Sequence, residues 1–211
     1  MEKSILEDAI NIIENEIKSL SNLIGNIDKE YIYVIECLKN CKGKIIFTAV
    51  GKSAYIAQKI AATMSSVGTP SFFIYASEAA HGDLGCISKE DVVFILSNSG
   101  ETDEIINIFG RIKDLKVKTI LLTGDKNSTL AKCVDFCIDI NVEKEAGYLS
   151  LAPTTSTTAM MIVGDSLAIM LSKLKGFKKK DFYKNHPGGA LGKSGRNECK
   201  EVSPAYFAKQ A

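Results

Sequence analysis

The chain has 211 residues, 45% hydrophobic and 24% charged, a balance that excludes a disordered protein and fits one globular domain with a full core. Its formal net charge of +1 gives no electrostatic attraction to nucleic acid or to an anionic membrane surface. The N-terminal residues are acidic where a signal peptide would be apolar, and no apolar run approaches the length of a bilayer span. We therefore expect a soluble cytoplasmic protein, in which the six scattered cysteines are free thiols.

The first part of the chain has the pattern of two helices. Apolar residues at helical spacing predict a helix over residues 2–24. A second helix is expected from Asp28, as N-cap, to Asn40, with Ile32, Ile35 and Leu38 as its apolar stripe. These elements form an N-terminal helical segment over residues 1–42.

From residue 43 onward, short apolar runs alternate with helical segments. The runs predict five strands, over residues 44–49, 71–75, 91–96, 118–123 and 135–140. Helices are expected over residues 53–67, 77–81, 102–115, 128–133 and 153–174, the last with Pro153 near its start and Gly176 at its end.

Each predicted strand is almost continuously apolar, as is typical of strands buried on both faces of a parallel sheet. The alternation predicts an α/β protein, a three-layer αβα sandwich with a five-stranded parallel sheet, preceded by the N-terminal helices. We expect one domain over residues 1–193, with its αβα core over residues 43–193 and a loosely held polar tail over residues 194–211.

Residues 97–102, with the sequence SNSGET, follow one predicted strand and open a predicted helix. A helix start presents unpaired backbone N–H groups and the positive end of the helix dipole, and the hydroxyls add further donors. Gly100 permits a turn that a side chain would hinder. Ser and Thr also cap helices, but capping needs only one hydroxyl. The 97–102 loop therefore predicts a phosphate site.

In such a fold, ligands bind beyond the carboxyl ends of the strands. Lys52 and Ser53 follow the first predicted strand, but a nucleotide-binding P-loop is excluded because Ile46 stands where that loop needs glycine. Glu104 lies in the helix after the 97–102 loop, and Glu145 follows the fifth strand. Structural ion pairs could account for either carboxylate alone.

The two histidines, His81 and His186, both lie beside glycines. A lone histidine is usually a surface or core residue, but a glycine-rich turn has little packing reason to carry an imidazole. Acid–base groups around a phosphate loop indicate proton transfer on a phosphorylated substrate. The candidate set is Lys52, His81, Glu104, Glu145 and His186.

With these residues the chain resembles the sugar isomerase (SIS) family, and within it the arabinose-5-phosphate isomerases. The SNSGE sequence of the 97–102 loop marks the broad family, while AAHGDLG at 79–85 and HPGGALG at 186–192 are specific to the subfamily. Further matching segments are Gly51-Lys52-Ser53, Gly68-Thr69-Pro70-Ser71-Phe72-Phe73, Lys144-Glu145-Ala146, Leu151-Ala152-Pro153-Thr154 and Ser156-Thr157-Thr158-Ala159.

The resemblance implies a flavodoxin-like SIS fold and interconversion of D-ribulose 5-phosphate and D-arabinose 5-phosphate through a cis-enediol(ate), without a cofactor. The implied catalytic residues are Lys52, Glu104, Glu145 and His186, with His81 also at the site, and the implied phosphate-binding residues are Ser53, Ser97, Ser99 and Thr102. The resemblance also implies a homotetramer with active sites between subunits, so His186 is expected to reach a neighbouring chain.

For the individual roles, we favour Glu145 over Glu104 as the base that moves the proton between C1 and C2. His81 or His186 suits ring opening, because imidazole titrates near neutral pH, and Lys52 would stabilise the enediolate oxygen. No metal is required. His81, Glu104 and His186 could bind adventitious zinc, as an inhibitor rather than as a cofactor.

The chain departs from the family in two places. Ala49 and Ala54 replace two glycines of the usual Gly-x-Gly-Lys-Ser-Gly, which could change how Lys52 is placed. Many members continue into paired CBS domains, which we do not expect here. Two alternatives remain, namely another SIS isomerase acting on 3-hexulose 6-phosphate or a heptose phosphate, and a non-catalytic sugar-phosphate-binding regulator.

Overall fold

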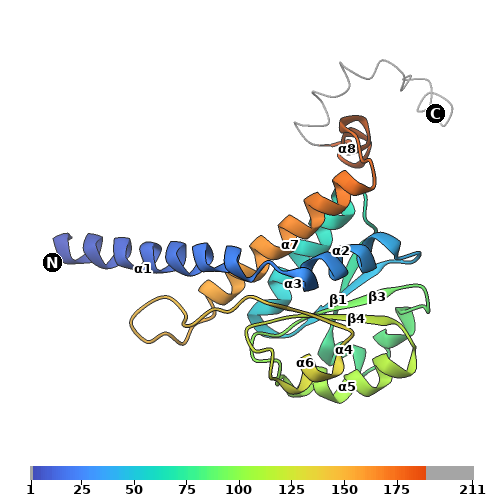
Figure 1. Ribbon diagram of the computed structural model, residues 1–211, viewed down its shortest axis with the longest axis horizontal. Coiled ribbons are helices and arrows are strands. Elements are labelled where there is room, and N and C mark those ends of the chain that lie inside the picture. Colours follow the sequence, from blue (N-terminus) through green and yellow to red (C-terminus); the bar gives the residue numbers. More distant parts are fainter. Residues whose placement is uncertain (1, 189–211) are drawn as a thin grey trace, which may run out of the picture.

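The computed structural model describes residues 2–188, with side chains from Ser4, and is built on a five-stranded parallel sheet (Figure 1). Its strands are β1 (Ile45–Ala49), β2 (Ser71–Tyr75), β3 (Val92–Leu96), β4 (Lys118–Thr123) and β5 (Phe136–Asp139). They lie in the order β2-β1-β3-β4-β5, and every neighbouring pair is parallel. The predicted strands and the αβα sandwich are confirmed. The predicted tail at 194–211, and 189–192 of HPGGALG, lie outside the described residues.

Helices cover both faces of the sheet. The first face carries α2 (Lys29–Asn40), α3 (Gly51–Ser66) and α7 (Thr155–Leu174). The second carries α4 (Ala76–Ala79), α5 (Asp103–Asp114) and α6 (Thr129–Cys133). The remaining elements are α1 (Glu2–Leu23), α8 (Lys179–Asn185) and the short 3-10 helices η1 (Ile24–Asn26) and η2 (Asp83–Cys86).

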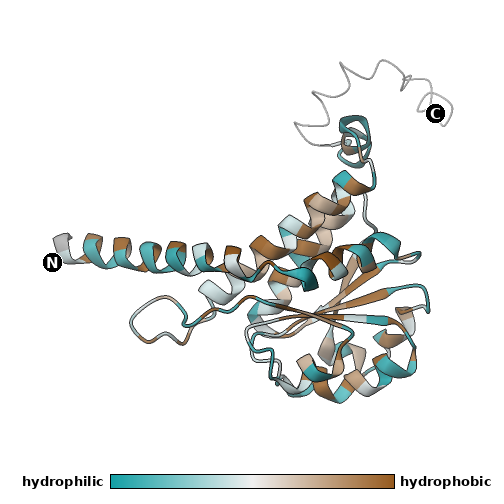
Figure 2. Ribbon diagram, in the orientation of Figure 1, coloured by the Kyte–Doolittle hydropathy of each residue, from teal (hydrophilic) through white to brown (hydrophobic). Residues whose placement is uncertain are grey.

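Alternate residues of each strand point to opposite helical layers, so the sheet is apolar on both sides and its strands are largely brown in Figure 2. In β1 and β3, Phe47 and Phe94 are register partners on the first face, and their rings stack at 5.1 Å. Ile46 and Val93, one residue earlier, are register partners on the second face. This two-sided burial explains why continuous apolar runs identified the strands.

The helix ends agree with the sequence in part. Asp28 is the N-cap of α2, and its carboxylate accepts a hydrogen bond from the Glu30 N–H at 2.9 Å. The apolar stripe predicted for α2 is wrong at Ile32, which is 55% exposed; Val34 takes its place in the core beside Ile35 and Leu38. Positions 34, 35 and 38 share one face of a helix, whereas position 32 lies on another.

The last long helix, α7, begins at Thr155, two residues after the predicted start, and ends before Gly176, whose φ is +68°. By length and composition it is the one described helix that could cross a membrane. Its buried side chains, among them Met160, Leu167 and Leu171, lie in the core shared with α3. One face of the helix is therefore packed in the core, while Ile162, Ile169 and Met170 are exposed.

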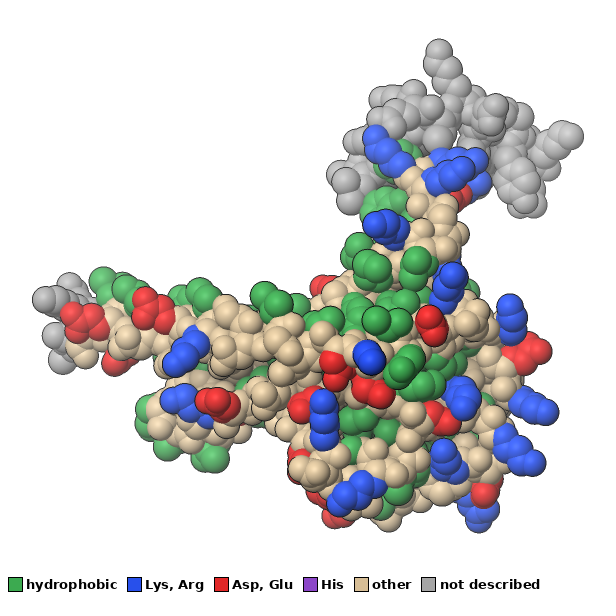
Figure 3. Space-filling model, viewed as in Figure 1, with side chains coloured by type: hydrophobic (Ala, Val, Ile, Leu, Met, Phe, Trp, Pro, Cys, Tyr) green, Lys and Arg blue, Asp and Glu red, His purple; other side chains and the backbone are tan. Residues whose placement is uncertain are grey.

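Helix α1 extends away from the body of the molecule (Figure 1) and carries a row of hydrophobic side chains along one side (Figure 3). The exposed apolar residues of this helix are Ile5, Leu6, Ile10, Ile12, Ile13 and Ile17. An apolar stripe of this length along one helix is typical of a surface that packs against another chain.

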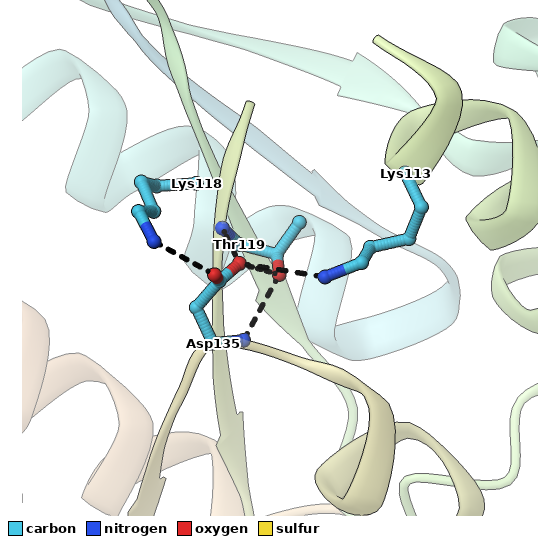
Figure 4. A network of polar contacts seen from close by, with 4 residues as sticks. All are labelled: Lys113, Lys118, Thr119 and Asp135. Carbon is cyan, nitrogen blue, oxygen red and sulfur yellow. Dashed lines mark hydrogen bonds and ion pairs between the residues drawn. The ribbon is translucent and has the colours of Figure 1, made fainter. Parts of the chain in front are cut away.

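At the amino ends of β4 and β5, Asp135 joins several donors (Figure 4). Its carboxylate accepts hydrogen bonds from the Thr119 hydroxyl at 2.7 Å and from the Lys118 ammonium at 3.0 Å, and Lys113 lies 3.6 Å away. Burial alone would raise the pKa of Asp135, but these hydrogen bonds and charges outweigh burial and lower the pKa to about 2.

We expect Asp135→Asn to lower the free energy of unfolding at pH 7 by about 1 to 2 kcal/mol, allowing for solvent around a side chain that is 21% exposed. Because the folded-state pKa is lowered, the stabilisation is present above about pH 4 and is lost as the pH falls toward 2. Urea unfolding at pH 7 and pH 3 measures this difference. Asp114→Asn, which breaks only the exposed pair with Arg111, should change stability little at either pH.

Candidate active site

The predicted site lies where the order of the strands reverses. β1 and β3 are neighbours in the sheet, yet the helices that follow them, α3 and α5, pack on opposite faces. Both helices begin at the carboxyl edge, so their N-termini flank the usual ligand position of doubly wound folds. Their backbone N–H groups and positive dipole ends favour an anion at this point.

A third helix N-terminus reaches the same edge, because α7 runs in the same direction as α3: Phe177, just after α7, lies against Gly68, just after α3. The Ile60 side chain packs directly on Gly164, and each of these residues lies nine positions after the start of its helix. Nearby, the Lys59 ammonium contacts the Asp165 carboxylate at 2.5 Å. The contact lies at equal distances along the two helices. The N-terminus of α3, which carries Lys52, and the N-terminus of α7 therefore lie next to each other.

The 97–102 loop holds its shape by internal hydrogen bonds. The Ser97 hydroxyl is buried, accepts from the Gly100 N–H at 3.0 Å and lies 2.7 Å from the Thr102 hydroxyl. The Ser99 hydroxyl is exposed and accepts from the Glu101 N–H at 3.2 Å. No described residue accepts a hydrogen bond from the N–H groups of Asp103 and Glu104, the first residues of α5. The loop thus leaves amides available to an anion.

Sequence reasoning missed the residues that support this loop from outside. The Asn98 carbonyl accepts hydrogen bonds from the Gly124 N–H at 2.9 Å and from the Thr123 hydroxyl at 3.1 Å. The Glu101 carboxylate accepts from the Thr129 N–H at 2.6 Å, at the start of α6. These partners lie at the end of β4 or after it, so only the adjacency of β3 and β4 could have revealed them.

Lys52 and Ser53 lie in the first turn of α3, which starts at Gly51 with φ of +58°. The Lys52 side chain is exposed, and its ammonium lies 5.9 Å from the centre of the Tyr55 ring. Ala49 and Ala54, which replace the family's glycines, are both buried within the regular strand and helix. The fold therefore accommodates both substitutions and keeps Lys52 at the carboxyl edge.

Glu145 is the most strongly held of the predicted residues. Its carboxylate accepts hydrogen bonds from the Thr154 N–H at 2.8 Å and the Ser156 N–H at 3.1 Å. The hydroxyls of the same two residues donate to it as well. Glu145 thus caps the N-terminus of α7, which is why the helix begins at Thr155 and not at Pro153.

A hollow of about 150 Å³ lies beside Glu145, between the loop that precedes α7 and the polar side of α1. Its α1 wall contains Asn15, Lys18 and Asn22. A larger hollow, of about 500 Å³, lies elsewhere, at the amino edge of the sheet beside Lys89 and Lys118. The helix N-termini, Lys52 and Glu145 lie at the carboxyl edge instead.

His81 and Glu104 also lie at the carboxyl edge, after β2 and in the first turn of α5. Both are exposed, and neither side chain forms a hydrogen bond or ion pair within residues 2–188. They are available to a ligand, but the single chain does not fix their orientation.

His186 is the one predicted residue that the chain places elsewhere. It follows α8, at the far end of α7, a helix about 30 Å long. Its Nδ1 lies 2.7 Å from the Phe182 carbonyl, and its ring stacks on that of Phe182. The Asn185 side-chain amide donates a hydrogen bond to the carbonyl of Ser66, the last residue of α3. This hydrogen bond holds α8 at the amino edge of the sheet. His186 therefore cannot meet Lys52 or Glu145 within one chain.

The inhibitory zinc predicted at His81, Glu104 and His186 would need all three side chains to be close together, but His186 lies at the opposite edge of the sheet from the other two. Among the described residues, no three His, Cys, Asp or Glu side chains are close enough to hold a metal ion. Zinc at these three residues would need ligands from two chains, and it stays a prediction.

Comparison with known proteins gives consistent matches. A model of the SIS domain matches residues 38–170. The arabinose 5-phosphate isomerases KdsD of Pseudomonas aeruginosa and Escherichia coli K12 are each 44% identical, over 89% and 86% of this chain. These matches cover 58% and 56% of the two relatives, so the chain spans little more than half their length. A structure from E. coli CFT073 in complex with arabinose 5-phosphate has 41% identity and a TM-score of 0.86, covering 89% of this chain and all of that one.

Proposed function

The chain belongs to the SIS domain family, and from that premise we propose that it is an aldose–ketose isomerase that interconverts D-ribulose 5-phosphate and D-arabinose 5-phosphate through a cis-enediol(ate). One observation carries the proposal. Lys52, the 97–102 loop and Glu145 lie at the N-termini of α3, α5 and α7, and these three N-termini lie at one edge of the sheet. The KdsD relatives and the structure with bound arabinose 5-phosphate support the choice of sugar. We retain the cytoplasm as the proposed location.

In this proposal the sugar's phosphate group binds between α3 and α5. Ser53, Ser99 and Thr102 donate to it with the free amides of α5, and Ser97 shapes the loop around it. The Lys52 ammonium stabilises the negative oxygen of the enediolate, and Glu145 carries the proton between C1 and C2. His81 or His186 opens the furanose, and Glu104 lies beside the sugar. The chemistry is proton transfer, for which these side chains suffice without a cofactor.

The proposal includes a homotetramer whose active sites lie between subunits. The apolar row of α1 and the exposed Tyr148, Leu149 and Leu151 of the neighbouring loop offer a surface for a second copy. Since His186 lies at the far end of α7 from Glu145, it would complete the site of a neighbouring chain.

Mixing two inactive variants tests this arrangement. His186→Ala and Glu145→Gln should each be nearly inactive alone. Co-expressed in equal amounts, they should regain about a quarter of the wild-type rate, because sites with wild-type Glu145 and His186 from different chains reappear. Steady-state assays of the copurified mixture measure this, and recovery no greater than the sum of the two variants would contradict a shared site.

The substrate is tested by incubating the purified protein with ribulose 5-phosphate, arabinose 5-phosphate, 3-hexulose 6-phosphate and sedoheptulose 7-phosphate, followed by NMR. We expect the two pentose phosphates to interconvert fastest. A faster reaction on the hexulose or heptulose phosphate would replace the proposed substrate, and binding without conversion of any sugar would indicate a regulator.

A further inference from the structure

The hydroxyl of Ser156 is committed to Glu145. Ser156 is 1% exposed and lies in the first turn of α7. Its hydroxyl donates a hydrogen bond to Glu145 Oε1, and its N–H donates to Oε2 at 3.1 Å. A buried hydroxyl that serves one carboxylate is costly unless that bond is kept. Among residues 2–188, Glu145 is therefore the one hydrogen-bond partner of the Ser156 hydroxyl.

The two carboxylate oxygens of Glu145 are held in different ways. Oε2 accepts from the backbone N–H groups of Thr154 and Ser156, and from the Thr154 hydroxyl at 3.3 Å. Oε1 accepts from the Ser156 hydroxyl alone among the described donors. Backbone donors survive any side-chain substitution, so Oε2 stays anchored in every variant, whereas the position of Oε1 depends on one hydroxyl.

The Thr154 hydroxyl has a different task. It accepts a hydrogen bond from the Ala146 N–H at 3.0 Å and reaches Glu145 only at 3.3 Å. It thus fastens the two ends of the loop over residues 146–154 to each other. This leaves Ser156 as the side chain that fixes the plane of the Glu145 carboxylate.

We propose that Ser156 is a positioning residue for proton transfer by Glu145, an inference that rests on the proposed function. Two anchored oxygens define the carboxylate plane, whereas an anchored Oε2 alone lets Oε1 rotate into the hollow shared with Asn15 and Lys18. A base displaced by about 1 Å from its proton can cost on the order of 100-fold in rate. Substrate binding depends on the separate phosphate site and should change little.

Two substitutions and one control test the proposal. In Ser156→Ala, kcat for pentose phosphate isomerisation should fall about 10- to 100-fold while KM changes less than about twofold. Ser156→Thr keeps the hydroxyl and should recover most of the rate. The control is Ser166→Ala, also on α7, which removes a hydroxyl 2.6 Å from that of Tyr31 and should leave kcat unchanged. An unaltered kcat in Ser156→Ala, or a Thr variant as slow as the Ala variant, would overturn the proposal.

A readout independent of activity separates the failure of this inference from failure of the proposed function. Ser156→Ala should lower Tm in the wild-type background and not in a Glu145→Ala background, because the hydrogen bond is then already absent. Equal Tm losses in both backgrounds would show that Ser156 does not act through Glu145. A Tm loss seen only in the wild-type background, in a protein inactive on pentose phosphates, would support the contact between Ser156 and Glu145. It would contradict the proposed isomerase function.

Discussion

Replacing Glu145 by Gln should abolish exchange of the substrate C2 proton with solvent and lower kcat by about 100- to 10,000-fold, the usual contribution of a placed base. The amide has the size of the carboxylate, and its oxygen can still accept from the Thr154 and Ser156 N–H groups. The variant should therefore fold and bind sugar phosphate while lacking the base. NMR exchange of the C2 proton in D₂O, with arabinose 5-phosphate as substrate, measures the effect.

Two further variants serve as a comparison and a control for Glu145→Gln. Glu104→Gln changes the other candidate carboxylate, which is exposed at the start of α5, and should slow exchange less. Asp135→Asn removes a carboxylate at the opposite edge of the sheet and should leave exchange unchanged. If Glu145→Gln exchanged the proton at the wild-type rate, the assignment of the base would be wrong.

The second large effect is expected at Gly100. Its φ is +63°, and a Cβ there would overlap the Ser128 side chain, which caps α6 by accepting from the Ala131 N–H. The backbone conformation alone costs a non-glycine residue about 1 to 2 kcal/mol, and relieving the overlap displaces the loop, the cap or both. Gly100→Ala should therefore lower Tm and reduce kcat/KM for pentose phosphate by on the order of 100-fold.

Gly110→Ala provides the matched control. Gly110 lies within α5, and nothing lies within 4 Å of where its Cβ would be. Alanine should stabilise the helix by about 0.5 to 1 kcal/mol and leave kcat/KM unchanged. Thermal unfolding and steady-state kinetics of both variants check this. A Gly100→Ala protein with wild-type Tm and kcat/KM would contradict the described geometry of the 97–102 loop.

Local sequence signals identified most of the fold. Continuous apolar runs such as 92–96 predicted the strands because both faces of the sheet are covered, and Asp28 identified the start of α2 by its own chemistry. The position of Ile32 was predicted wrongly because helical spacing admits two overlapping stripes. Which stripe is buried depends on how α2 packs against α7 and β5, information that no local pattern contains.

The sequence predicted which residues form the candidate site but not how they are arranged in space. Lys52, Glu104 and Glu145 were found because each follows a strand, and parallel strands end at one edge. The hydrogen bonds that support the 97–102 loop join residues far apart along the chain, such as Glu101 with Thr129, so spacing gave no sign of them. The distance of His186 from the other residues became visible only once α7 and α8 were placed.

The central claim is that this chain interconverts pentose phosphates by proton transfer at the carboxyl edge of the sheet. Its most direct test is NMR of ribulose 5-phosphate incubated with the full chain in D₂O. We predict formation of arabinose 5-phosphate with deuterium at C2, and deuterium at C1 of the remaining ribulose 5-phosphate. Ribulose 5-phosphate that stays unconverted and free of deuterium would contradict the claim.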